Sequence, residues 1–465
     1  MKKVDFVFSY EVKARELESV CMIKQELENR GYTTAVLNTW QAINRRPLDL
    51  MAEVLVLSAC YRTSTLNSFA SNIRHYHKAV NLQWEQIRST EAERAVPEDV
   101  TKSNYYYSGK ALQAVHVSWG QKNADHLVKN CGIPERNVIL AGHPTLDYLR
   151  PELRSYYLTR EELFSQYGLP TEKKVALFIS SFSLVGIPES ELMLGKSFGD
   201  HTIDEKTILF GRSQAEILRW FRSALEKTSD TVFVYRPHPA EANNPALKAL
   251  EAEYENFRVI KDGPVKQWIL ACDVIYNWNS TSLAEVYMCG KSCYMLRPLP
   301  LPDSANASIF DGVEGIQTEA DFLKSLEEPN PAFPISEERL RYYYYIPEEK
   351  CTYQLICDAL ERIYHDRSYQ INGWKDYYRR DKIVRRFWDD LASSRLGAKL
   401  AGMKRLPSVF RKVQNKIISR RTTWENPEKG LSDYAIEMRR LNGASPEEIE
   451  AMCTRLRQLT QASGL

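Results

Sequence analysis

The sequence predicts an α/β protein with two doubly wound, Rossmann-like domains that face each other, followed by a helical C-terminal extension. Short apolar runs alternate with helical segments of roughly 10–15 residues, which is typical of βαβ units and a parallel sheet. This alternation stops at a charged, tyrosine-rich stretch over 149–167 and then begins again. With 465 residues the chain is longer than one hydrophobic core usually supports, so at least two domains are expected.

The first predicted domain covers residues 1–150. It begins with a buried strand over 4–9 and a helix over 13–30, which Gly31 ends as a typical C-terminal residue. The other expected strands are 32–37, 54–59, 79–84, 114–118 and 138–141, and the other expected helices are 66–77 and 121–130.

The second predicted domain covers residues 151–370 and repeats the pattern. Its expected strands are 174–180, 231–235, 257–260, 274–276 and 292–296, and its expected helices are 211–227, 283–289 and 352–365. Two such domains that face each other across a cleft define the GT-B architecture of many glycosyltransferases. Ligands of doubly wound sheets bind at the carboxyl ends of the strands, so the residues that follow each strand are the candidates for function.

The composition is that of an ordinary soluble protein. The chain has 62 basic and 60 acidic residues, so its overall charge points to no partner. Its nine cysteines lack C-x-x-C spacing, which favours free thiols in a reducing compartment. The N-terminus has no signal-peptide pattern, and no apolar run approaches the length of a membrane span. A cytoplasmic protein is therefore expected.

Two segments follow strands of the second domain and carry the strongest functional signal. In Tyr235-Arg236-Pro237-His238-Pro239-Ala240-Glu241, two prolines restrict the backbone around His238. The imidazole could contact the phosphate or leaving group of a donor, or could simply lie exposed in a rigid turn. Arg236 could grip a phosphate or pair with Glu241, which we expect to be a solvated carboxylate at a helix start.

The second segment, Asn279-Ser280-Thr281-Ser282-Leu283-Ala284-Glu285, places three hydroxyls at an expected helix N-terminus. Ser280, Thr281 and Ser282 are ordinary capping residues, or part of an anion site with His238 at a neighbouring strand end. Glu285 could bind the ribose of a nucleotide, or complete a capping box with Ser282. Ser180 and Ser181, which end the first strand of the domain, are further donor-binding candidates.

Candidates on the acceptor side come from the first domain. Glu11 follows the first strand and is the best candidate for a catalytic base. Lys13 and Arg15 could serve the acceptor side, or could form an ordinary solvated first turn together with Glu16. His143, in a second His-Pro pair, and Asp147 lie near the expected hinge and could line the cleft. The sequence contains no Asp-x-Asp triplet, so no metal site is expected, and it has neither a P-loop nor a G-x-S-x-G elbow.

These residues carry a family resemblance over roughly residues 4–300. The segments 10–16, Trp119-Gly120 and 139–153, with the His-Pro and Ser/Thr-rich segments, resemble the bacterial surface carbohydrate biosynthesis proteins. They are also similar to capsule polysaccharide transferases and CDP-glycerol phosphotransferases. The resemblance implies that His238 and the Ser280–Ser282 hydroxyls contact a donor phosphate and that Glu285 holds its ribose. Where related chains read Gly-Asn-Pro-Arg-Phe-Asp, this chain has Gly142-His143-Pro144-Thr145-Leu146-Asp147 and lacks the arginine.

The extension over 371–465 carries a separate signal. Residues 395–421 contain nine Lys or Arg, no acidic residue and interleaved apolar side chains. Such a segment is typical of proteins that bind an anionic membrane surface. It predicts a peripheral protein at the inner face of the plasma membrane. The alternatives are a helix packed on the body of the protein and an arm that binds a partner. Nucleic-acid binding is not expected, because no recognition fold accompanies the charge. Ser445 and Pro446 predict the start of a last helix.

The sequence therefore favours a metal-independent glycosyltransferase of surface polysaccharide synthesis. It would use a CMP-, CDP- or UDP-linked sugar as substrate, no cofactor, and a glycan or lipid-linked acceptor. Three alternatives remain: a CDP-glycerol or CDP-ribitol polyol-phosphate transferase, a non-catalytic scaffold of an assembly complex, and a nucleotide-sugar epimerase. The epimerase would need several carboxylates in the cleft, of which only Glu11 and Asp147 can be placed.

Overall fold

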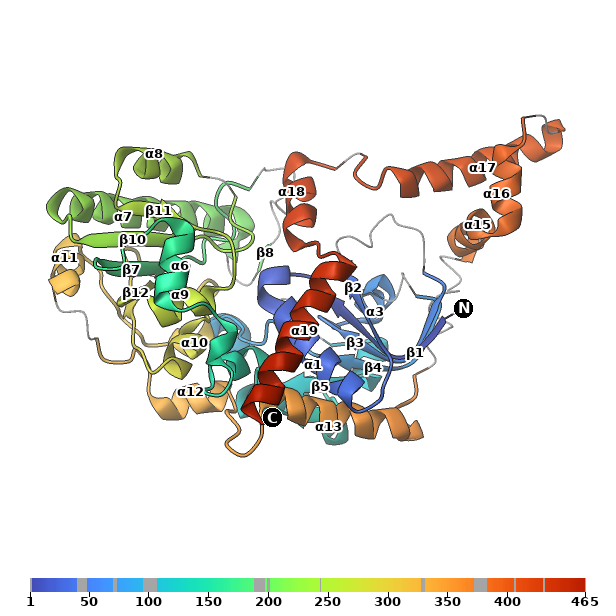
Figure 1. Ribbon diagram of the computed structural model, residues 1–465, viewed down its shortest axis with the longest axis horizontal. Coiled ribbons are helices and arrows are strands. Elements are labelled where there is room, and N and C mark those ends of the chain that lie inside the picture. The colour runs from blue at the N-terminus through green and yellow to red at the C-terminus, as the bar shows by residue number, and fades with distance from the viewer. Residues whose placement is uncertain are drawn as a thin grey trace.

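The computed structural model describes residues 2–39, 48–69, 73–94, 107–187, 197–198, 201–242, 244–327, 331–371, 383–404, 407–429 and 431–464. It contains two open parallel sheets, one of six strands and one of five, each with helices packed around it. Figure 1 shows the two domains side by side, with helices of the C-terminal region between and beyond them. The predicted fold class is confirmed.

The sheet of the first domain has the strand order β2-β1-β3-β4-β5-β6, and all of its neighbouring strands are parallel. Its middle strands are buried apolar runs, as expected for a parallel sheet covered on both faces. The strands are β1 (Lys2–Tyr10), β2 (Thr34–Asn38), β3 (Leu50–Leu57), β4 (His75–Asn81), β5 (Val115–Ser118) and β6 (Val138–Leu140). A π-helical turn (Lys13–Leu17) leads into α1 (Glu18–Asn29); the shorter helices are α3 (Thr63–Phe69), α4 (Thr90–Arg94) and α5 (Gln121–Asp125).

One prediction in this domain is wrong. The sequence favoured a helix over 66–77 and a strand over 79–84, but α3 ends at Phe69 and β4 already begins at His75. The backbone of β4 pairs with β3 from Met51 opposite His75 to Leu57 opposite Asn81. Pairing with a strand that lies earlier in the chain decides the conformation here, and local pattern does not contain that information.

The sheet of the second domain has the order β11-β10-β7-β12-β13. The two signature segments were predicted to follow neighbouring strands, but β7 lies between β10 and β12. The strands are β7 (Lys174–Ile179), β10 (Thr231–Arg236), β11 (Phe257–Val259), β12 (Val274–Asn277) and β13 (Tyr294–Met295), with a separate hairpin of β8 (Ser197–Phe198) and β9 (His201–Thr202). The helices are α6 (Arg160–Tyr167), α7 (Ile203–Lys227), α8 (Pro245–Glu253), α9 (Val265–Ala271), α10 (Leu283–Met288), α11 (Glu319–Glu327) and α12 (Glu337–Tyr343).

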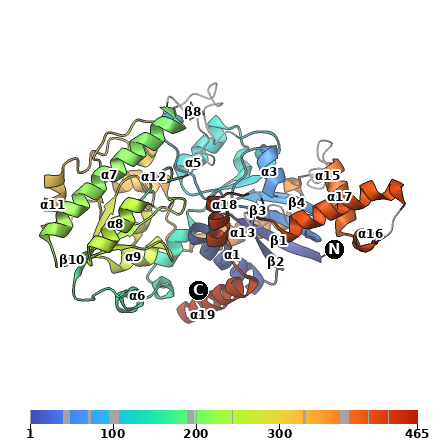
Figure 2. The same ribbon diagram turned by 90° about the horizontal axis from the view of Figure 1, so that it is seen from above.

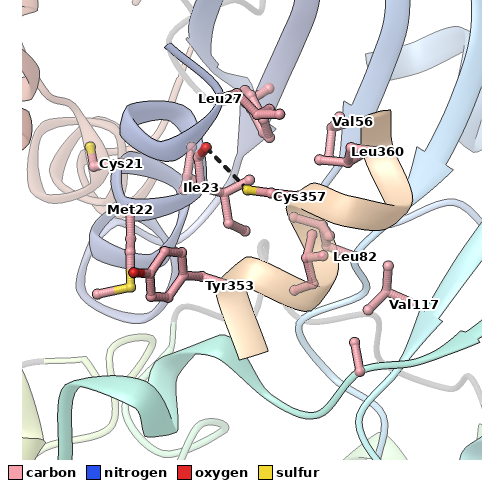
Figure 3. Packing of buried hydrophobic residues seen from close by; sticks show 14 of the residues in the cluster. Cys21, Met22, Ile23, Leu27, Val56, Leu82, Val117, Tyr353, Cys357 and Leu360 are labelled. Atoms are coloured by element: carbon pink, nitrogen blue, oxygen red, sulfur yellow. Dashed lines mark hydrogen bonds between the residues drawn. The ribbon is translucent and has the colours of Figure 1, made fainter. Parts of the chain in front are cut away.

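Helix α13 (Thr352–His365) has the predicted bounds but packs in the core of the first domain, although its place in the sequence predicted that it belongs to the second. Its buried residues Tyr353, Cys357 and Leu360 pack between α1 and the sheet, and the Cys357 thiol contacts the carbonyl oxygen of Ile23 (Figure 3). The amphipathic pattern predicted the helix but not which of two apolar sheets it covers.

The C-terminal region forms three further parts. Helices α15 (Ile383–Ser393), α16 (Arg395–Gly402) and α17 (Ser408–Glu425) pack on one another and project from the body as an arm (Figure 1). Helix α18 (Asp433–Asn442) lies between the two domains in both views (Figures 1 and 2). Helix α19 (Pro446–Ser463) begins at the predicted Ser445 cap and packs along α1. Among the helices described, none is long and apolar enough to cross a bilayer.

Candidate functional site

The His238 loop follows β10 and is held by a buried carboxylate. The backbone N–H of His238 donates to Glu241 Oε2 (3.0 Å), and Glu241 also accepts from Gln214 Nε2 (2.7 Å), the Tyr235 hydroxyl (2.8 Å) and the Ser180 hydroxyl. Glu241 is only 1% exposed, so the prediction of a solvated carboxylate is wrong. Its role is to fix the turn that presents His238.

The ring of His238 has a defined orientation within that turn. Its Nδ1 accepts the backbone N–H of Ala240 (3.1 Å), which leaves Nε2 to carry the proton of the neutral ring. Burial lowers the pKa of His238 to about 4; Arg15 and Lys261 act in the same direction and Glu85 opposes them. At neutral pH the side chain is therefore an uncharged N–H donor.

Arg236 does not point a free guanidinium at the site. Its Nη1 donates to the carbonyl oxygens of Ile260 (2.7 Å) and Asp262 (2.6 Å), and its Nη2 donates to that of Gly263 (2.6 Å). Both terminal nitrogens are thus used to hold the loop 260–263, which leads into α9. Among the described residues the ion pair considered with Glu241 is not formed, and these three bonds favour a structural role for Arg236 over a phosphate fork.

The two serines after β7 differ. The Ser180 hydroxyl donates to Glu241, and its oxygen lies 3.1 Å from the Tyr235 hydroxyl oxygen, so it belongs to the network that supports the His238 loop rather than to a donor-binding surface. The buried Ser181 hydroxyl has no hydrogen-bond partner among the residues that the structure describes. Ser181 is thus the hydroxyl of this loop that remains a candidate for binding a donor.

The hydroxyl-rich turn after β12 has its predicted place at the start of α10. Asn277 braces it, since Oδ1 accepts from Ser280 N (2.7 Å) and Nδ2 donates to Ser280 O (2.8 Å). Ser282 occupies the N-cap position but its side chain makes no capping bond, so the expected capping box with Glu285 is not formed. Burial raises the pKa of Glu285, against the nearby charge of Lys266. The Glu285 carboxylate is therefore not used as a cap partner.

Glu11 follows β1 and stands beside a buried partner. Glu16, which is fully buried, accepts the backbone N–H of Glu11 through Oε2 (2.7 Å) and Arg15 Nη2 through Oε1 (2.7 Å). These bonds hold the turn over 11–16 in place. Burial and the charges of Glu16 and Glu85 raise the pKa of Glu11 to about 7, against the opposing charge of Arg15. Glu11 therefore titrates in the range useful to a general base at neutral pH.

The two domains bring their candidates together at one place. Arg15 forms ion pairs with Glu16 and with Glu85, which follows β4 in the first domain. Both Arg15 and Glu85 act electrostatically on His238 of the second domain. We call Glu11, Arg15, Glu16, Glu85 and His238 the junction cluster.

His143 lies deeper in the junction. Its Nδ1 accepts the backbone N–H of Thr145 (3.1 Å), as His238 does from Ala240, so the two His-Pro turns share one local geometry. The ring packs against Trp119, with ring centroids 4.0 Å apart. Burial, with the charges of Lys266 and Arg15, holds its pKa well below the usual value, so this imidazole is neutral.

Two acceptor-side candidates have other roles. Asp147 is buried and accepts the backbone N–H groups of Thr352 (2.9 Å) and Tyr353 (2.8 Å), so it caps α13; burial raises its pKa to about 6 despite these bonds. Lys13 pairs with Glu448 of α19 (2.5 Å). Neither side chain belongs to the junction cluster, and the prediction that they line the acceptor side is not supported by their contacts.

Sequence reasoning missed three members of the site. Glu85 directly follows an expected strand, so the rule that found Glu11 could have found it. Glu16 lies in a turn that was predicted to be solvated, but its side chain is fully buried. Lys266 is buried and pairs with Glu18 of α1 across the domains (3.1 Å), and no local pattern marks a buried lysine in advance.

No family model matches this chain, and no curated protein matches it in sequence. Among solved structures, the wall teichoic acid polymerase TagF is similar with a TM-score of 0.50 and 13% identity, over 77% of this chain and 89% of that one. UDP-GlcNAc 2-epimerases from Methanocaldococcus jannaschii (TM-score 0.44, 11% identity, 77% and 100% covered) and Neisseria meningitidis (0.45, 13%, 78% and 100%) are also found. At this identity the likeness to TagF concerns the fold, and it confirms the predicted twin-domain, GT-B-like architecture.

Proposed function

We propose that the protein is a GT-B glycosyltransferase that transfers a sugar from a nucleotide-activated donor to a glycan or lipid-linked acceptor in bacterial surface polysaccharide synthesis. The observation that carries the proposal is the junction cluster. In it, the Glu11 carboxylate, whose pKa is about 7, and the neutral imidazole N–H donor of His238 from the other domain share Arg15 and Glu85 as charged neighbours.

The two groups suit the two ends of the reaction. The acceptor hydroxyl forms a bond to the anomeric carbon and gives its proton to the Glu11 carboxylate. The bond between that carbon and the donor's phosphate oxygen breaks, and the electron pair leaves with the nucleotide. His238 Nε2–H donates a hydrogen bond to the departing phosphate, where preorganised donors stabilise developing charge.

The remaining donor contacts come from the second domain. Thr281 and Ser282 supply hydroxyls near the phosphate, Ser181 supplies a third, and Glu285 binds the ribose hydroxyls. Arg15 adds positive charge from the first domain, although Glu16 and Glu85 already pair with it.

The test is turnover of a donor panel by the full-length protein. Purified protein is incubated with CMP-, CDP-, UDP- and GDP-linked donors and candidate acceptors, and nucleotide release and product mass are measured. We expect one donor class to turn over, His238→Ala to lose activity by at least a hundredfold, and the exposed control Glu255→Ala to retain it. Binding of no nucleotide and turnover of no donor would sink the proposal.

Product mass also separates the alternatives. A polyol-phosphate transferase moves the phosphate with the polyol, an epimerase leaves the nucleotide attached, and a scaffold needs neither His238 nor Glu11. The fold shared with a teichoic acid polymerase makes CDP-glycerol a necessary member of the panel.

We further propose that the arm, residues 383–425, lies on an anionic membrane surface. Its exposed apolar side chains include Phe387 (56%), Leu396 (59%) and Phe410 (51%), and its exposed basic residues are Arg395, Lys399, Lys404, Arg411, Lys412 and Lys416. The apolar residues of α15 extend the surface beyond the predicted 395–421. Apolar contact and attraction to anionic lipid would act together here.

Vesicle flotation tests the arm. Each lysine near an anionic surface contributes about 1 kcal/mol, so Lys412→Gln with Lys416→Gln should weaken partition by roughly thirtyfold. Two exposed lysines of the second domain, Lys227 and Lys248, give the matched control pair. Equal binding to neutral and anionic vesicles, or equal losses in both pairs, would contradict the proposal.

A further inference from the structure

Helix α18 is hydrogen-bonded to two loops that carry members of the junction cluster. The Tyr434 hydroxyl, near its start, donates to the carbonyl oxygen of Ala240 in the His238 loop (3.1 Å). Asn442, at its end, accepts the backbone N–H of Lys13 through Oδ1 (3.0 Å), two residues after Glu11. One helix of ten residues therefore bonds to the second domain at one end and to the first domain at the other.

Each contact lies one step from a candidate catalytic group. The Ala240 whose carbonyl accepts from Tyr434 also donates its N–H to His238 Nδ1 (3.1 Å), the bond that leaves the proton on Nε2. Lys13 continues directly from Glu11, whose own N–H is held by Glu16. A shift of one end of α18 would move the His238 loop, and a shift of the other end would move the turn that carries Glu11.

The ends of α18 are themselves well anchored. Asn442 is buried; its Nδ2 donates to Met438 O (2.9 Å), and its carbonyl oxygen accepts from Asn38 Nδ2 (2.7 Å). The Ser432 hydroxyl caps the start of the helix by accepting Ala435 N–H (3.1 Å). Beyond Asn442, α19 packs along α1, where Cys453 and Leu456 are buried in the first domain's core. The first-domain end is thus fixed, and the Tyr434 end reaches across to the second domain.

We propose that α18 is a strap between the domains and that Tyr434 and Asn442 are positioning residues, Tyr434 for His238 and Asn442 for Glu11. The inference rests on the proposed function for what the positioned groups do, but not for whether α18 positions them. In a two-domain transferase the donor and acceptor groups must meet in one geometry, and misplacement by about 1 Å can lower the rate a hundredfold. A helix bonded to both loops sets that geometry.

Hydrogen–deuterium exchange of the full-length protein, without substrate, tests the strap directly. Tyr434→Phe should speed exchange over 237–242 about fivefold, and Asn442→Ala should do so over 11–17, the change that corresponds to one hydrogen bond. Asn442→Asp keeps an oxygen acceptor for Lys13 N–H and should restore protection. The matched control is Tyr369→Phe, which removes a hydroxyl bond to Arg136 O (3.3 Å) at the far edge of the first sheet.

Kinetics with the donor that the wild type accepts separates positioning from general stability. Tyr434→Phe should raise the donor KM about fivefold with little change in kcat. Asn442→Ala should lower kcat about tenfold and move the acidic limb of the pH profile, which Tyr369→Phe should leave in place. Unchanged exchange in both loops would overturn the strap. Faster exchange with wild-type KM, kcat and pH profile would overturn the positioning roles. Failure of the wild type to bind any nucleotide would instead sink the proposed function while the exchange result still decides the strap.

Discussion

Glu241→Ala is the substitution that tests most sharply how the His238 loop is built. The buried carboxylate accepts four hydrogen bonds, two at each oxygen: His238 N and the Ser180 hydroxyl at Oε2, and Gln214 Nε2 and the Tyr235 hydroxyl at Oε1. Removing both oxygens leaves four donors without their acceptor. At about 1 kcal/mol for each bond, the change should destabilise the second domain by about 4 kcal/mol.

Glu241→Gln tests how the four hydrogen bonds are divided between the two oxygens. The glutamine side chain keeps one carbonyl oxygen and places an NH₂ donor where the other oxygen was, so it can satisfy one pair of donors but not both. We expect it to cost about 2 kcal/mol, half of the alanine value. The exposed Glu255→Ala in the same domain should change stability by no more than about 0.5 kcal/mol.

The measurement must report on one domain, because a chain with two domains need not unfold in one step. Urea-dependent hydrogen exchange of peptides from β7 and β10 gives the free energy of opening for the second domain. If Glu241→Ala lowers this free energy of opening by less than about 1 kcal/mol, the four-bond network is refuted, because about 1 kcal/mol is the value of a single bond. Equal losses for the alanine and glutamine variants would refute the sharing of two donors by each oxygen.

Three further predictions concern the other buried charges. If Glu11 is the base, activity requires its ionised form, so the rate should fall as the pH drops below the Glu11 pKa of about 7, by about tenfold from pH 8 to pH 6. Glu11→Gln should abolish this acidic limb of the pH–rate profile. An acidic limb near pH 4.5 in the wild type would contradict the assignment. Asp147→Ala removes two bonds to the N-terminus of α13 and, at about 1 kcal/mol for each bond, should cost about 2 kcal/mol in exchange protection of that helix, whereas the exposed Glu135→Ala should cost little. Arg236→Met removes three bonds to carbonyl oxygens and should speed hydrogen exchange over 260–263, whereas the exposed Arg136→Met should leave that exchange unchanged. Weaker donor binding by Arg236→Met without faster exchange would instead support a phosphate-binding role for Arg236.

Much of the architecture could be predicted because it is encoded over short distances. A parallel strand buried on both faces is an apolar run wherever it occurs, and His238, Ser282 and Glu11 were found because each follows such a run. Helix α13 has its predicted bounds, and the Ser445 cap is formed as predicted. These features depend on side-chain periodicity and capping, which a neighbouring stretch of sequence contains.

The roles of individual charged residues could not be predicted in the same way. Asp147 caps a helix 205 residues later in the chain, and Glu241 gathers donors from strand β10, helix α7 and two loops. Whether a carboxylate is solvated or buried depends on which elements, often distant in the sequence, pack against it. Local sequence therefore overestimated the number of side chains free to bind a substrate, and Arg236 and Ser180 are the clearest cases.

By itself, the sequence determined that this protein has two doubly wound sheets, and it located the loops at the carboxyl ends of their strands. Strand and helix periodicity is a local property, so a single chain reveals it. Only the tertiary structure decided which loops meet. It brought Arg15 and Glu85 to His238, placed β7 between the two signature strands, and laid α18 between the domains. These outcomes follow from the packing of surfaces far apart in the chain, where the burial of a charge depends on partners that no local pattern names.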